Sequence, residues 1–221
     1  RSIVPGEKTA EPIRTRGWTH WHHLFTPRQL LIFGTINRVL PEDLGHVTEA
    51  AACQLGIGRS INWTSRLTGW DPSAANEKSN ATFQNQALNT MTIYAVRALP
   101  SLHSSWYLAQ GNYSCAGTGS VNIADARAVD TSCDAWLTDP PYADAINYHE
   151  LSEFFLAWYE KHLPRLFPDW YADSKRALAI RGSGKAFREG MVDAYRNLAT
   201  HMPDNGMQIV MFTHQDAGVW A

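Results

Sequence analysis

Apolar residues recur at the three- and four-residue spacing of a helix through the first half of the chain. Thr26-Pro27-Arg28-Gln29 has the signature of a helix start, because Thr suits the N-cap, Pro suits the first helical position and Gln can complete a capping box. We predict an extended lead-in over 1–17 and a mainly helical region over 18–110. Gly56 and Gly58 fall inside the second predicted helix and indicate a kink or close packing there. The predicted helices cover residues 27–40, 42–68 and 86–99, and a loop covers 73–82.

The pattern changes at Gly111, where short apolar runs begin to alternate with amphipathic stretches. A strand, a helix and a further strand in this order indicate a right-handed crossover in a parallel sheet. We therefore predict an α/β domain over 111–221. Its strands are expected at 121–123, 135–138 and 207–213, its helices at 149–162 and 184–202, and a short helix near 172–180 within a loop.

Composition narrows the class of protein without identifying a partner. The 221 residues are 44% hydrophobic and 18% charged, as in an ordinary globular protein. No apolar run reaches the ~18 residues of a membrane span, and we expect no membrane association. The net charge of -2 lacks the basic footprint typical of nucleic-acid binding.

The cysteines and histidines give no indication of a metal site. Three cysteines without a Cys-x-x-Cys pair argue against a disulfide framework or a zinc site, so we expect a reducing, cytoplasmic setting. The spacing of His20, His22 and His23 fits no usual metal site. We predict no bound metal.

The motif that carries chemistry is Asp139-Pro140-Pro141-Tyr142, directly after a predicted strand. In parallel sheets, ligands bind beyond the carboxyl ends of the strands. The exocyclic amine of a nucleobase is a poor nucleophile because its lone pair is delocalised into the ring, and acceptors aimed at its two hydrogens favour the tetrahedral geometry needed for attack. Asp139 offers a carboxylate and Pro140 a carbonyl, while the prolines stiffen the turn. Tyr142 offers a face on which a base can stack, worth ~1–3 kcal/mol. A plain turn is the alternative interpretation.

These residues resemble the large prokaryotic adenine-specific DNA methylases, which are amino-methyltransferases. The resemblance touches most of residues 18–220 and is strongest over 137–158; it includes the segments 24–30 and 83–88. It implies a Rossmann-like methyltransferase fold, S-adenosylmethionine as methyl donor, and DNA as partner. It also implies that the chain is part of a longer protein, with which it would act.

One element of the family pattern is missing from the chain. The glycine-rich loop that holds the donor should lie between a strand and a helix. Gly117-Thr118-Gly119 precedes a predicted strand instead, and Gly56-Ile57-Gly58 lies within a predicted helix. The resemblance places the loop upstream of Arg1, so we expect the chain to hold the base side of the site and little of the donor side.

Further positions have candidate roles. By resemblance, Asp125 and Ala126 lie where an acid accepts a hydrogen bond from the adenine amine of the donor. The segment Phe25-Thr26-Pro27 resembles an element near the methionine end of the donor, although an N-cap alone explains Thr26. From their positions in the sequence, we also consider Asn147 and Tyr148 for closing over the base and Arg176 and Arg181 for phosphate contacts. A surface turn, core packing and a solvated face are the simpler alternatives.

The sequence therefore predicts methylation of an exocyclic amino group, with adenine N6 in DNA as the first choice. Asp at the first motif position favours DNA, because Asn is commoner in the similar enzymes that modify RNA or a protein glutamine. Those substrates remain alternatives. A third alternative is a non-catalytic nucleic-acid-binding module with a decayed motif.

Overall fold

The computed structural model describes residues 1–40, 47–71, 78–84, 114, 116–141, 146–182 and 184–212. The chain divides into two compact units. The first unit comprises Arg1–Ser120 and Phe154–Tyr171, and the second comprises Val121–Glu153 and Ala172–Ala221. Within the described ranges, no helix has both the length and the apolar character to cross a membrane.

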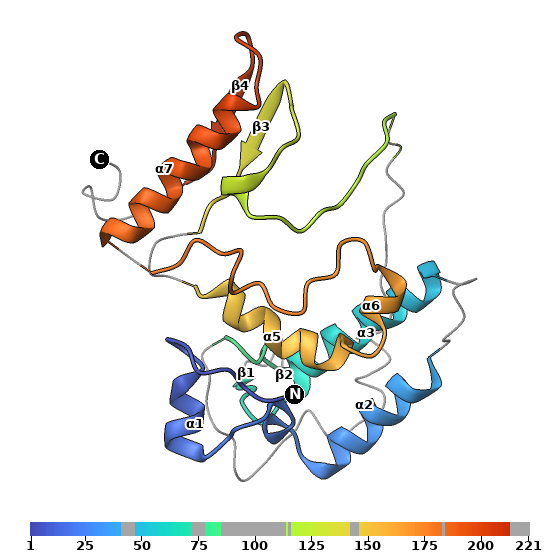
Figure 1. Cartoon of the computed structure of the whole chain (residues 1–221). Coiled ribbons are helices and arrows are strands. Elements are labelled where there is room, and N and C mark those ends of the chain that lie inside the picture. The colour runs from blue at the N-terminus through green and yellow to red at the C-terminus, as the bar shows by residue number, and fades with distance from the viewer. Residues whose placement is uncertain are drawn as a thin grey trace. The chain divides into compact units, whose positions relative to one another are not determined.

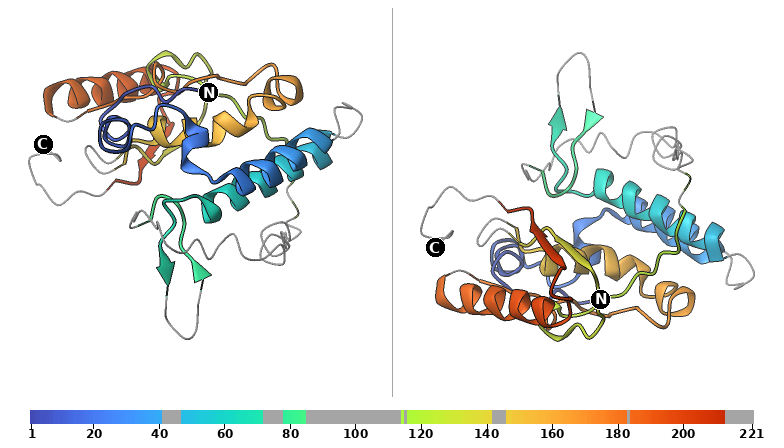
Figure 2. Two further views of the ribbon diagram at one scale, coloured as in Figure 1. Left: turned by 90° about the horizontal axis from the view of Figure 1, so that it is seen from below. Right: turned by 90° about the horizontal axis from the view of Figure 1, so that it is seen from above.

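Helices dominate the described part of the first unit (Figure 1). Helices α2 and α3 pack against each other, as the two views of Figure 2 show. Two short strands beyond α3 form an antiparallel hairpin, in which Trp70 pairs with Ser79. The elements are α1 (Ala10–Arg16), the 3-10 helix η1 (Trp21–Leu24), α2 (Pro27–Val39), α3 (Val47–Thr64), β1 (Trp70–Asp71), β2 (Lys78–Ser79), the later part of α5 (Tyr148–Tyr159), and α6 (Leu163–Leu166).

Aromatic side chains form the core of the first unit. Phe154 on α5 has no exposed surface, and its ring stacks on that of Phe25 with the centroids 5.7 Å apart. Trp158, one turn further along α5, meets Phe25 edge-on at 5.1 Å. Phe83 meets Phe154 in the same way at 5.2 Å. Such edge and stacked pairs stabilise a core beyond their area of burial, so α5 is anchored in the first unit by its apolar face.

The predicted start of α2 is confirmed. Thr26 accepts a hydrogen bond from the backbone N–H of Gln29, and the Gln29 side chain accepts one from the backbone N–H of Thr26, which completes the capping box. The Gln29 side chain is buried and also donates to the carbonyl of Thr64. The cap therefore fixes the start of α2 and ties it to the end of α3.

The lead-in differs from the sequence prediction. Residues 10–16 form helix α1 instead of an extended segment. Glu11 lies in its first turn and Arg14 and Arg16 lie in its last, an arrangement that complements the helix dipole. Gly17 adopts the left-handed conformation (φ 66°) that ends many helices, and its N–H bonds back to Ile13.

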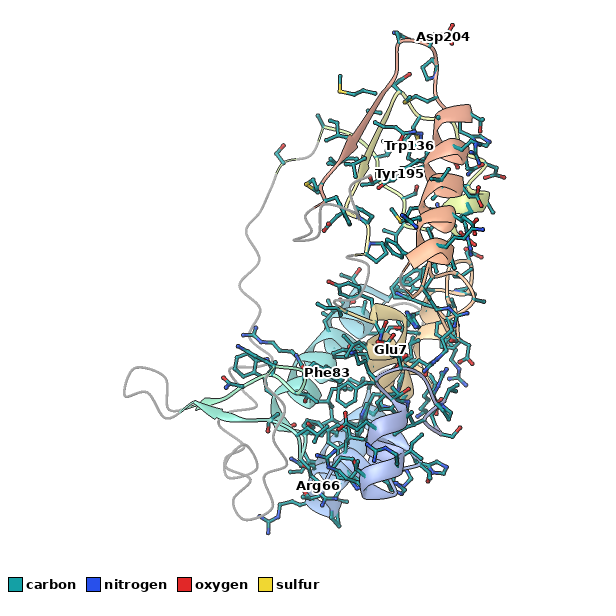
Figure 3. All side chains as sticks on the ribbon, turned by 90° about the vertical axis from the view of Figure 1, so that its left-hand side faces the viewer. Glu7, Arg66, Phe83, Trp136, Tyr195 and Asp204 are labelled. Carbon is teal, nitrogen blue, oxygen red and sulfur yellow. The ribbon has the colours of Figure 1, made fainter. Side chains whose placement is uncertain are left out.

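The second unit contains a parallel strand pair covered by a helix. Strand β3 (Ala135–Thr138) pairs in parallel with β4 (Met207–Val210), with Leu137 opposite Ile209. Helix α7 (Gly184–Thr200) packs on the 3-10 turn η4 (Ala126–Ala128). Trp136 on β3 and Tyr195 on α7 lie between the sheet and the helix (Figure 3). The α/β class and the parallel pairing are confirmed, whereas two strands are too few to establish a Rossmann-like sheet.

Three further elements depart from the predictions. Residues 121–123 are not a strand; Val121 is 69% exposed and no strand of the described chain pairs with it. Residues 172–180 form bends and turns instead of a helix. In this segment, the side chains of Ser174 and Arg176 donate hydrogen bonds to Glu153. Residues 78–79, predicted as loop, form β2. The helix predicted at 86–99 lies outside the described residues.

Candidate functional site

A cavity of about 400 Å³ lies beside the carboxyl end of β3 in the second unit. Asp139, Pro140 and Pro141 follow the strand directly and line the cavity, and Asp139 is exposed. The two prolines lack N–H groups and fix φ, so the turn holds its carbonyl directions. The described part of the predicted motif therefore borders a space open to a ligand. Tyr142 lies outside the described residues.

One wall of the cavity comes from the turn before β3. Ala124 and Ala126 line this wall. The side-chain amide of Asn197 on α7 donates hydrogen bonds to the carbonyls of Ala126 (3.1 Å) and Val129 (2.9 Å). Helix α7 thus holds η4 in place beside the motif.

A second wall is the start of α5. Asn147 and Tyr148 both line the cavity, and their predicted role in closing over a base stays a prediction. The backbone carbonyl of Asn147 accepts from the N–H groups of Glu150 and Leu151 and so begins the helix. Tyr148 is 57% exposed, which leaves its ring accessible.

The third wall is the segment 178–182. Arg181 lines the cavity and is exposed. Ile180 packs closely on Gly190 of α7, where a Cβ would lie 3.0 Å from its Cγ2. Phe187 on α7, 4% exposed, closes the apolar side of the cavity. The cavity therefore combines one carboxylate, one guanidinium and an apolar floor.

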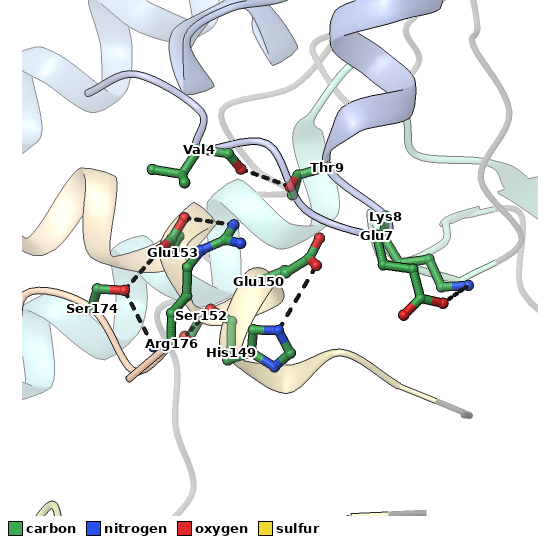
Figure 4. Close-up of polar contacts among 10 residues, drawn as sticks. All are labelled: Val4, Glu7, Lys8, Thr9, His149, Glu150, Ser152, Glu153, Ser174 and Arg176. Atoms are coloured by element: carbon green, nitrogen blue, oxygen red, sulfur yellow. Dashed lines mark hydrogen bonds and ion pairs between the residues drawn. The ribbon is translucent and has the colours of Figure 1, made fainter. Parts of the chain in front are cut away.

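A buried ion pair anchors the chain that leads into this third wall (Figure 4). Glu153 on α5 is 1% exposed, and its Oε1 accepts from Nε of Arg176 at 2.8 Å and from the Ser174 hydroxyl at 2.9 Å. Its Oε2 accepts from Nη2 of Arg176 at 3.2 Å. The structure thus places Arg176 on Glu153 and outside the cavity lining, unlike the phosphate contact considered from the sequence. Arg176 acts here as a positioning residue.

The sequence analysis missed His149, which also lines the cavity. Its side chain is 10% exposed, and its Nε2 lies 3.8 Å from Oε1 of Glu150, itself 3% exposed (Figure 4). Burial lowers the pKa of His149 below 6.5, and the charges of Arg181 and Arg176 lower it further, while Glu150 and Glu153 act in the opposite direction. The lowered pKa favours the neutral imidazole. Its place in the first turn of an amphipathic helix, ten residues after Asp139, was the available indication.

Most of the residues assigned to the donor make structural contacts of their own. Phe25, 4% exposed, belongs to the aromatic core of the first unit, and the Thr26 side chain caps α2. Pro27 opens that helix. Asp125 accepts from the backbone N–H of Arg127 (2.9 Å), and its Oδ2 lies 2.6 Å from Nη2 of the same residue. These hydrogen bonds lower the pKa of Asp125.

Ala126 is the one member of the donor set that lines the cavity. Phe25, Thr26 and Pro27 belong to the first unit, whereas Asp125 and Ala126 belong to the second, and their assignment to the donor stays a prediction. The described part of the chain contains no group of three His, Cys, Asp or Glu side chains placed to hold a metal ion. Comparison with protein-family models, curated proteins and solved structures found no match to this chain.

Proposed function

We propose that this chain binds the exocyclic amino group of a nucleobase for S-adenosylmethionine-dependent methylation, with adenine N6 of DNA as the target. The observation that carries the proposal is the cavity beside Asp139, Pro140 and Pro141. The resemblance to adenine-specific DNA methylases gives this cavity its expected chemistry.

The amino group would enter with its hydrogens toward the motif. The Asp139 carboxylate accepts one hydrogen and the Pro140 carbonyl accepts the other. Two acceptors in fixed positions draw the nitrogen away from planarity, so its lone pair becomes available for attack. Because the turn is stiff before the base arrives, little reorganisation is needed when the reaction occurs.

The remaining lining suits a base taken out of a duplex. A volume of about 400 Å³ lies within the roughly 300–1,000 Å³ range of small-ligand sites. Tyr148 has an accessible ring for stacking, which supports recognition of a flipped base. Arg181 places a positive charge at the cavity, where a phosphate of the flipped nucleotide would lie.

The methyl donor is part of the proposal by resemblance alone. S-adenosylmethionine supplies an electrophilic methyl group when bound. The residues assigned to the donor belong to both units, so the proposal for this chain rests on how it holds the acceptor amine. Asp139 and Pro140 perform that task irrespective of which residues hold the donor.

The test compares two aspartates at opposite ends of one strand. Asp134 precedes β3 and Asp139 follows it. In the full-length protein, Asp139→Ala should lower transfer of a radiolabelled methyl group to unmethylated DNA by roughly 10²–10³-fold, as when one fixed transition-state partner is removed. Asp134→Ala should retain activity. Full activity in Asp139→Ala would refute the proposed role.

The same assay identifies the substrate. RNA and a glutamine-containing protein are offered in parallel with DNA. Transfer to RNA or protein alone would replace DNA as the substrate while leaving the role of Asp139 in place. No transfer to any of the three polymers by the full-length protein would count against an enzymatic function.

A further inference from the structure

Two arginines from distant parts of the first unit share one indole ring. The Cζ of Arg16, at the end of α1, lies 5.4 Å from the centroid of the Trp18 ring. The Cζ of Arg66, just beyond α3, lies 5.0 Å from the same ring. Trp18 is 7% exposed. Both guanidinium groups are therefore held near one fixed aromatic surface by cation–π contacts.

Each arginine has few partners apart from the ring. Arg66 donates from Nη1 to the carbonyl of His23 at 3.3 Å, and the described chain pairs neither Arg66 nor Arg16 with a carboxylate. The end of α1 favours one cation at Arg16 through the helix dipole. It does not account for the second cation on the same ring. Two like charges at one ring repel each other, and an anion bound between or beside them would remove that repulsion.

A cluster of histidine rings follows Trp18 in the chain. The rings of His20, His22 and His23 cluster with centroids 4.4–5.6 Å apart. The Nδ1 of His23 accepts from the backbone N–H of Thr19 at 3.2 Å, so neutral His23 carries its proton on Nε2 as a donor. The contact of Arg66 Nη1 with the His23 carbonyl places His23 beside one of the two arginines.

We propose that Arg16, Trp18, Arg66 and His23 form a binding surface for the phosphodiester backbone of DNA. Guanidinium groups are well suited to phosphate because their N–H groups match its oxygens in pairs. The shared indole orients both groups before the phosphate arrives, which reduces the entropy lost on binding. The protein as a whole carries a charge of -2, so a local surface of this kind supplies the attraction that its net charge does not.

This surface deepens the proposed function, since DNA is the substrate proposed there. It belongs to the first unit, whereas the Asp139 cavity belongs to the second. Its test measures binding without methyl transfer, so the two proposals can fail separately. If the chain binds DNA through this surface but transfers no methyl group, the proposed binding surface stands and the proposed enzymatic function fails.

The experiment uses two charge-matched double variants of the 221-residue chain. Arg16→Gln with Arg66→Gln removes two charges while leaving long side chains to cover Trp18. Arg38→Gln with Arg59→Gln removes two charges from exposed positions on α2 and α3. Binding of a fluorescently labelled duplex is measured by anisotropy over a series of salt concentrations. Thermal melting followed by circular dichroism establishes that each variant is folded.

We expect the Arg16/Arg66 substitutions, but not the Arg38/Arg59 substitutions, to change the salt dependence of DNA binding. Each phosphate contact contributes about 0.9 to the slope of log K against log[salt]. The Arg16/Arg66 pair of substitutions should reduce the slope by about 1–2 and weaken binding in low salt, while the Arg38/Arg59 pair leaves the slope unchanged. Equal slopes for the two double variants, or no DNA binding by the unmodified chain, would overturn the proposal. If the glutamine variant does not fold, Arg16→Lys with Arg66→Lys keeps the charge and loses the planar stacking, and unchanged affinity in that variant would equally overturn it.

Discussion

Gly58 on α3 leaves the space that the hydroxyl group of Tyr159 on α5 occupies. A Cβ at position 58 would coincide with this hydroxyl and lie 3.0 Å from the ring carbon that carries it. Phe155, one turn earlier on α5, is the next nearest group at 3.8 Å. The glycine therefore sets how closely the two helices approach, which agrees with the close packing predicted for this part of the sequence.

Gly58→Ala should destabilise the protein by about 1–3 kcal/mol, because overpacking forces Tyr159 or a helix to move. Gly34→Ala is the matched control. Gly34 also lies in a helix, but a Cβ there meets nothing within 4 Å, so alanine should stabilise by up to about 1 kcal/mol through its higher helix propensity. Urea denaturation measures both free energies of unfolding. Equal effects of the two substitutions would contradict this role for Gly58.

Glu153→Ala should destabilise the second unit strongly, because the largely buried guanidinium group of Arg176 would lose the carboxylate of Glu153. The expected loss is about 3–5 kcal/mol, as for one partner removed from a buried ion pair. Hydrogen exchange followed by mass spectrometry should show faster exchange in residues 172–182 before the rest of the unit. Lys185→Ala breaks an exposed pair with Glu189 and should change stability by less than about 1 kcal/mol. Unaltered exchange over 172–182 in Glu153→Ala would show that the ion pair does not hold this wall.

Acidification should weaken the fold through His149. Burial lowers the pKa of this imidazole below its usual 6.5, so the unfolded chain binds a proton at a higher pH than the folded chain does. Stability from this group is complete above pH 6.5 and falls as the pH decreases through the lowered pKa of the folded state. Urea denaturation between pH 7.5 and pH 5 should show that His149→Gln has a smaller acid-induced loss than the unmodified chain. The same acid-induced loss in His149→Gln and in the unmodified chain would contradict this role for His149.

Thr26→Ala should cost about 1 kcal/mol of stability, because the first turn of α2 loses its side-chain acceptor. Thr26→Ser keeps the hydroxyl group and should remain within a few tenths of a kcal/mol of the unmodified chain. Thermal denaturation of both variants tests the cap. Equal melting temperatures for the two variants would leave the N-cap without an energetic role.

Local sequence patterns predicted the elements that depend on local chemistry. Thr26 and Gln29 are three residues apart, and the cap they form needs no distant partner. The strand Ala135–Thr138 has the predicted bounds. Residues 121–123 have a similar apolar pattern but no pairing strand among the described residues, and a strand depends on its neighbour for hydrogen bonds.

The sequence predicted where the candidate site begins, because its motif is continuous in the chain, whereas the role of that motif stays a prediction. Asp139, Pro140 and Pro141 are adjacent in the sequence, and the cavity beside them lies at the expected end of the strand. The role of Arg176 could not be predicted, because its partner Glu153 is 23 residues away. The lowered pKa of His149 comes mainly from burial, which depends on the packed chain, whereas that of Asp125 comes mainly from hydrogen bonds to Arg127, two residues away.

The boundary between the two units falls within helix α5. Glu153 belongs to the second unit and holds the segment beside the cavity, whereas Phe154 belongs to the aromatic core of the first unit. Dividing the chain at this boundary would split α5 between the two resulting fragments. Truncated versions of the protein that begin or end near residue 153 should therefore be poorly soluble, and reagents for studying either half are better made by point substitution.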